Sequence, residues 1–129
     1  LSALLAWVRQ GGKVIYPGPH PMTYGTPMAE LLGAVAVDYR APAMVNFQAF
    51  GRSWACAHFP ADTRLQVEPT SAQVKARDQY GLPVLLQHKL GQGCVSWTVP
   101  LVESAVTAVA GTPSVRDAWH HWYVGMLEM

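Results

Sequence analysis

The stretch Leu4–Pro19, LLAWVRQGGKVIYPGP, decides the fold that we predict for this chain. Together with Leu1, its residues Leu4, Leu5 and Val8 recur at the spacing of one helix face. Gly11 or Gly12 then ends the helix, because a residue without a Cβ adopts the left-handed conformation at little cost. The next residues, 13–16, are rich in β-formers and predict a strand. Helix, glycine stop, strand and loop make the second half of a βαβ unit, so we expect its first strand upstream of this chain.

Composition predicts one folded domain over residues 1–129, and the missing first strand leads us to expect that this domain is a fragment of a longer chain. Half of the residues are hydrophobic and only 13% are charged, which excludes the disordered class and indicates a surface covered by partners. Nine Lys and Arg against eight Asp and Glu leave a net charge of +1, and no basic run indicates nucleic-acid binding. No apolar run approaches the roughly 20 residues of a membrane span.

The following residues predict a mixture of helices and strands, which we name by range. We expect helices over 26–32, 102–110 and 115–127, and a β-hairpin over 82–99 that turns at Gly91 and Gly93. Further strands are expected over 34–40, 44–50 and 64–68, with either a strand or a buried helical turn over 53–59. The polar stretch 69–80 is expected to lie on the surface. The core face of the last helix is predicted to hold Val115, Ala118, Trp119, Trp122, Tyr123, Met126 and Leu127.

Three residues are candidates for a ligand or interface contact: His20, Tyr24 and Trp54. The first two lie in the Pro- and Gly-rich loop after the first strand, and open α/β sheets place ligands at the carboxyl ends of strands. Trp54 lies near a turn, and exposed aromatic faces stack on sugar rings or anchor protein interfaces. The alternative is a loop that its prolines make rigid and that binds nothing.

Two stretches resemble a known family. Residues 4–42, with the pattern L-x-x-W-V-x-x-G-G-K-V-I … G-T-P-M-A-E-L-L-G-A-V-A-V, resemble the class I glutamine amidotransferase-like domain of glycoside hydrolase family 42 β-galactosidases. In those enzymes this domain follows the catalytic barrel and is called the trimerisation domain. Residues 82–100, which pass from one strand through G-x-G into another, resemble a late segment of the same domain.

The resemblance implies a flavodoxin-like α/β sandwich with a mainly parallel sheet, the late hairpin and a C-terminal helix. It also implies a domain without its own catalysis or cofactor, which assembles a homo-oligomer and packs on the catalytic barrel of the same or a neighbouring chain.

The residues themselves do not form a hydrolase site. A class I amidotransferase needs its nucleophile in G-x-C-x-G at a strand-to-helix elbow, where a histidine lowers the pKa of the thiol. Cys56 has no flanking glycines, and Cys94 begins a strand. Two cysteines are too few for a disulfide framework, so free thiols are expected, although one bridge between them is an alternative.

Metal and glycosidase chemistry are not expected either. The adjacent pair His120 and His121 point about 100° apart on a helix, unlike the i, i+4 pairs of zinc sites. No two of the eight acidic residues stand out as the facing carboxylates that sugar hydrolysis needs.

Three functions therefore remain, in this order. The first is a non-catalytic accessory and oligomerisation domain of a β-galactosidase-like glycoside hydrolase. The alternatives are a freestanding carbohydrate-binding module, or a small cysteine hydrolase that uses Cys56 or Cys94.

Overall fold

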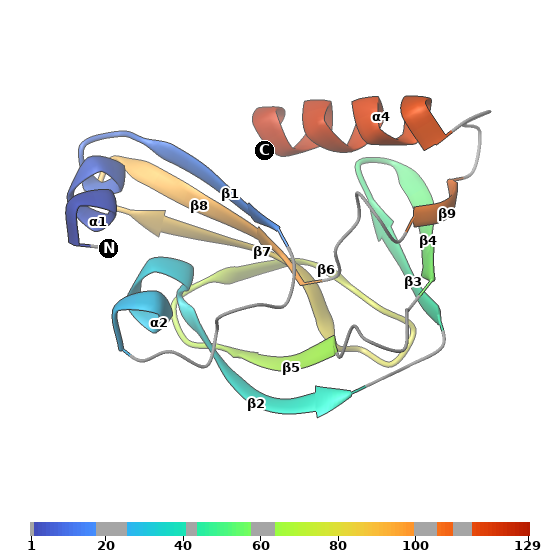
Figure 1. Ribbon diagram of the computed structural model, residues 1–129, viewed down its shortest axis with the longest axis horizontal. Coiled ribbons are helices and arrows are strands. Elements are labelled where there is room, and N and C mark those ends of the chain that lie inside the picture. The colour runs from blue at the N-terminus through green and yellow to red at the C-terminus, as the bar shows by residue number, and fades with distance from the viewer. Residues whose placement is uncertain (1, 18–25, 41–43, 58–63, 100–105, 110–114) are drawn as a thin grey trace.

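The computed structural model describes residues 2–17, 26–40, 44–57, 64–99, 106–109 and 115–129 (Figure 1). In these residues three helices combine with nine short strands. The elements are, in chain order, α1 Ser2–Arg9, β1 Lys13–Pro17, α2 Thr26–Leu32, β2 Ala34–Arg40, β3 Met44–Ala49, β4 Arg52–Ala57, β5 Arg64–Pro69, β6 Gln73–Arg77, β7 Pro83–Leu90, β8 Gly93–Thr98, β9 Val106–Val109 and α4 Val115–Glu128.

The opening stretch folds as predicted. Helix α1 buries Leu5 and Val8 and ends before Gly11, which has a φ of 116°. Strand β1 follows at once, and helix α2 likewise ends at Gly33, with a φ of 66°. An exposed ion pair between Arg9 and Glu30 links α1 to α2.

The largest sheet has the strand order β1-β8-β7-β6. Strands β1 and β8 run parallel, whereas β7 pairs antiparallel with both β8 and β6. The hairpin expected over 82–99 is therefore confirmed, but the mainly parallel sheet is wrong for the described residues. The short turns at 78–82 and 91–92 are the cause, because a parallel pair needs a crossover of a dozen or more residues.

Two smaller sheets flank the large one. Strands β2 and β5 form an antiparallel pair, and β3, β4 and β9 form a three-stranded antiparallel sheet. The helix expected over 102–110 is wrong for its described residues, 106–109, which pair as a strand with β4. Of the two alternatives for 53–59, the strand is correct.

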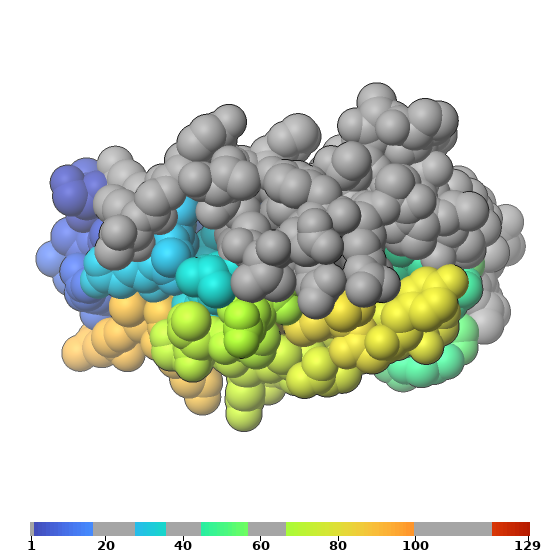
Figure 2. Space-filling model, turned by 90° about the horizontal axis from the view of Figure 1, so that it is seen from below, coloured from blue at the N-terminus to red at the C-terminus, as the bar shows by residue number. Residues whose placement is uncertain are grey.

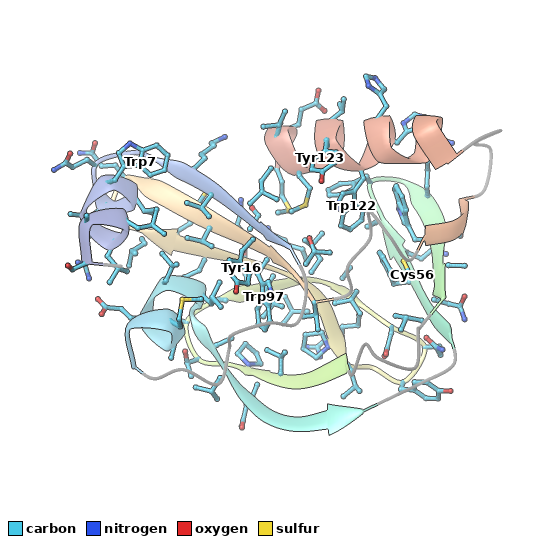
Figure 3. All side chains as sticks on the ribbon, viewed as in Figure 1. Trp7, Tyr16, Cys56, Trp97, Trp122 and Tyr123 are labelled. Atoms are coloured by element: carbon cyan, nitrogen blue, oxygen red, sulfur yellow. The ribbon has the colours of Figure 1, made fainter. Side chains whose placement is uncertain are left out.

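Two hydrophobic clusters lie on opposite faces of the large sheet. One lies between the sheet and α1, α2, β2 and β5, and it contains the fully buried Trp97. Figure 3 shows Tyr16 and Trp97 directed to that side, and Trp122 on the side of α4. The second cluster contains Phe47, Trp54 and Trp122. The Trp122 ring meets the other two edge to face, with its centroid 5.9 Å from that of Phe47 and 4.8 Å from that of Trp54.

In residues 120–128, where side-chain burial is described, helix α4 buries fewer of the predicted core residues than expected; the side chains of Val115, Ala118 and Trp119 lie outside the described ones. Trp122 and Met126 are buried, as expected, but Tyr123 and Leu127 are 38% and 62% exposed. This leaves apolar surface on α4.

Candidate functional site

An open groove of about 890 Å³ lies where the large sheet approaches the three-stranded sheet. It is lined by residues 46–48 of β3, 53–55 of β4, and 74–79 of β6 and the turn after it. Figure 2 shows the yellow residues near 80 beside the green residues of β3 and β4. The volume falls within the range of about 300 to 1,000 Å³ that small-molecule sites occupy.

The groove exists because two edge strands meet at one point and then separate. Phe47 of β3 and Asp78 after β6 form an isolated antiparallel bridge. Next to it, the backbone amide of Asn46 donates a hydrogen bond of 2.8 Å to Oε1 of Gln79. The two sheets are therefore joined at the bridge, and the groove opens beside it.

The turn after β6 forms a firm wall of the groove. Oδ1 of Asp78 accepts hydrogen bonds of 2.9 Å from the backbone amides of Tyr80 and Leu82. The guanidinium of Arg77 donates to the Gly81 carbonyl at 3.0 Å. These bonds order the turn, and the last one holds the Arg77 guanidinium against it.

Polar side chains line the groove from both sheets. On β3, Gln48 Nε2 donates to Ser53 Oγ of β4 at 2.5 Å, and the exposed Asn46 lies two residues before Gln48. On β6, Lys75 and Arg77 are both exposed, on either side of the buried Ala76. Among the lining residues the one acid is Asp78, which is 7% exposed and bound by its own turn. The charged groups that face the groove are therefore both cationic.

Of the three predicted contact residues, the structure describes one. His20 and Tyr24 lie outside the described residues. Trp54 is only 1% exposed, so the expectation of an exposed ring is wrong, although residue 54 is among those that line the groove. It is part of the second hydrophobic cluster, where its indole Nε1 donates to the Ala49 carbonyl at 2.9 Å and its ring stacks on Phe47.

The cysteines do not form a nucleophilic site. Neither takes part in a disulfide bond, which answers the disulfide alternative. Cys56 is 1% exposed on β4, and a nucleophile must reach its substrate. Cys94 lies on β8, with its sulfur 4.0 Å from the Gln87 amide nitrogen, and not at a strand-to-helix elbow.

The described histidines do not form a metal site. The rings of His120 and His121 are 6.3 Å apart at 62°. Across the part of the chain that the structure describes, no three His, Cys, Asp or Glu side chains gather to hold a metal ion. The described part also contains no helix long and apolar enough to cross a membrane. Elsewhere, His88 is buried, with Nδ1 3.0 Å from the Leu31 carbonyl, and it fixes α2 on the sheet.

Sequence reasoning missed the groove because it assigned 69–80 to the surface by polarity alone. A period of two was present, with Val74, Ala76 and Asp78 alternating with Lys75, Arg77 and Gln79. That alternation is typical of a strand with one solvent-exposed face.

Neither family models nor curated proteins gave a match to this chain. Solved structures match it over nearly its whole length. The exo-β-1,4-mannosidase Op5Man5 from Opitutaceae bacterium strain TAV5 matches 97% of this chain and 22% of its own, with a TM-score of 0.80 and 27% identity.

Two β-galactosidases match with lower identity. Gan42B, a GH42 enzyme from G. stearothermophilus, has a TM-score of 0.69 and 12% identity over 98% of this chain and 18% of its own. The enzyme from Bacillus circulans sp. alkalophilus has a TM-score of 0.68 and 17% identity over 98% of this chain and 20% of its own. This chain spans about a fifth of the length of these enzymes. It therefore has the fold of a glycoside-hydrolase-related domain.

Proposed function

We propose that this chain is a non-catalytic accessory domain of a β-galactosidase-like glycoside hydrolase, which joins subunits and shapes the sugar-binding cleft. One observation carries the proposal: glycosidases match 97–98% of this chain with only about a fifth of their own length. A domain of that share leaves room for a catalytic barrel elsewhere in the polypeptide, which is the partner that we propose.

The finer assignment, an amidotransferase-like domain of flavodoxin-like topology, belongs to the same proposal. Strand β1 supports it, because among the described residues it pairs on one side only, with β8. Its other edge suits the parallel strand that we expect upstream of α1.

The described side chains support a role without catalysis. Catalytic carboxylates and thiols face a cleft, whereas here Glu30 pairs with Arg9, Asp78 binds its own turn, and Cys56 is buried. The cysteine hydrolase therefore receives no support from the geometry of these residues.

An assembly role is supported by apolar surface on α4. Tyr123, Val124 and Leu127 are 38%, 37% and 62% exposed, and they lie within one stripe of the helix. The buried core of a homodimer interface is more apolar than the rest of a protein surface, and tyrosine is enriched among the residues that anchor it. We assign this stripe as the contact between copies in the homo-oligomer.

The test is the mass of the native polypeptide by sedimentation velocity, for the wild type and for Val124→Glu/Leu127→Glu. We expect an assembled wild type and a smaller species for the variant, because two buried carboxylates oppose association. Glu128→Gln, on the same helix, should leave the mass unchanged, and circular dichroism checks that each variant is folded. A monomeric wild type, or a folded double variant with unchanged mass, refutes the assignment.

A further inference from the structure

We infer that the groove between β3 and β6 is a binding site for an acidic saccharide, a sugar that carries a carboxylate. The choice of a sugar rests on the proposed function, whereas the choice of an anion rests on the charges of the groove. The nearest alternative is that the two cations only protect an edge strand from pairing with other strands.

The charge argument begins with Lys75 and Arg77. They are two residues apart on β6, both are exposed on either side of the buried Ala76, and both line the groove, although the register with β7 shifts on either side of Ala76. Within the described residues Lys75 has no hydrogen-bond or ion-pair partner, and Arg77 has only the Gly81 carbonyl. A carboxylate between the two would receive charge-assisted hydrogen bonds from both.

The opposite wall supplies groups that suit hydroxyls. The side-chain amide of Asn46 has no hydrogen-bond partner within the described residues, and Gln48 uses its Nε2 on Ser53 while its oxygen is left to accept. An amide both donates and accepts, as a ring hydroxyl does. Cations on one wall and amides on the other thus match a ligand with a carboxylate at one edge and hydroxyls at the other.

The groove is also preformed. Hydrogen bonds within the protein hold both walls without a ligand. They are the Phe47–Asp78 bridge, the bond from the Asn46 backbone amide to Gln79, and the bonds of the Asp78 turn. A site that is ordered before binding loses less conformational freedom when a ligand enters.

Isothermal titration calorimetry of the full chain tests this with trigalacturonic acid and with its methyl ester, in which each carboxylate has lost its charge and gained a methyl group. We expect the acid to bind at least tenfold more tightly than the ester, and its affinity to fall as the salt concentration is raised. Lys75→Gln and Arg77→Gln should each lower the affinity for the acid at least tenfold. Lys89→Gln, an exposed cation on β7 outside the groove, is the matched control and should change nothing.

Three results overturn the inference. If acid and ester bind equally, the two cations have no role in binding. If the acid shows no saturable binding up to about 10 mM, the cations serve only to protect the edge strand from pairing. Inorganic phosphate competing as well as the saccharide at equal ionic strength reduces the groove to a simple anion site. None of these results changes the sedimentation mass, so a failure here is distinct from a failure of the assembly role.

Discussion

Replacing Gly93 by alanine is the sharpest test of how the opening stretch meets the late hairpin. An added Cβ at this position lies 2.0 Å from the Val8 carbonyl oxygen and 2.2 Å from the Gly12 carbonyl oxygen. Both neighbours are backbone atoms, so no side chain can turn aside. The end of α1 and the start of β1 must instead move away from β8 by about 1 Å to restore the 3.0 Å that real Cβ contacts keep.

That movement breaks two hydrogen bonds, from the Cys94 amide to the Gly12 carbonyl at 3.1 Å and from the Gln92 amide to the Arg9 carbonyl at 3.0 Å. Each contributes about 0.5–1.5 kcal/mol, and overpacking adds about 1–3 kcal/mol. We expect the free energy of unfolding to fall by about 2–6 kcal/mol, out of roughly 6–19 kcal/mol for a domain of this length.

Urea unfolding followed by tryptophan fluorescence measures the change, with the slope of the transition as a check on two-state behaviour. Gly51→Ala is the control, because its φ of 72° brings strain of about 1–2 kcal/mol but no atom lies within 4 Å of the added Cβ. If Gly93→Ala costs no more than Gly51→Ala, the steric reasoning is wrong.

Three smaller predictions concern single side chains. Thr98→Val should raise the free energy of unfolding in urea by about 1 kcal/mol, because the buried Oγ1 has no hydrogen-bond partner within the described residues; a clear loss would contradict this. Burial raises the pKa of the Tyr16 phenol above 10.0, so the folded state holds its proton more tightly and stability should decrease as pH rises above about 10. Tyr16→Phe should flatten that decrease in alkaline denaturation curves, and an unchanged slope would count against it. Glu30→Gln should lower stability by only about 0.2–1 kcal/mol in thermal melts, because its ion pair with Arg9 is exposed, and a larger loss would show that α2 depends on it.

Much of the fold could be predicted where local patterns agree with the tertiary environment. The Gly11 and Gly33 stops follow from backbone sterics, and the hairpin over 82–99 combines two apolar runs with a glycine turn. Strand β9 shows the limit. Its small residues fit a helix or a strand, and its partner β4 lies about 50 residues earlier, so long-range pairing decided its structure.

The candidate site was harder to predict, because it exists only where β3 meets β6. Their bridge joins Phe47 to Asp78, and no local pattern reports such a contact. The turn before Trp54 favours an exposed ring, whereas the alternation of Trp54 and Cys56 with Ser53 and Ala55 is typical of a strand that directs the indole into the core.

The most direct test of the accessory-domain account is the intact mass of the native polypeptide, measured together with its mass in solution. The account predicts a chain several times longer than 129 residues, since this segment spans about a fifth of the matching glycosidases, and it predicts that this chain assembles into an oligomer. A native chain of only 129 residues that is monomeric in solution would contradict it.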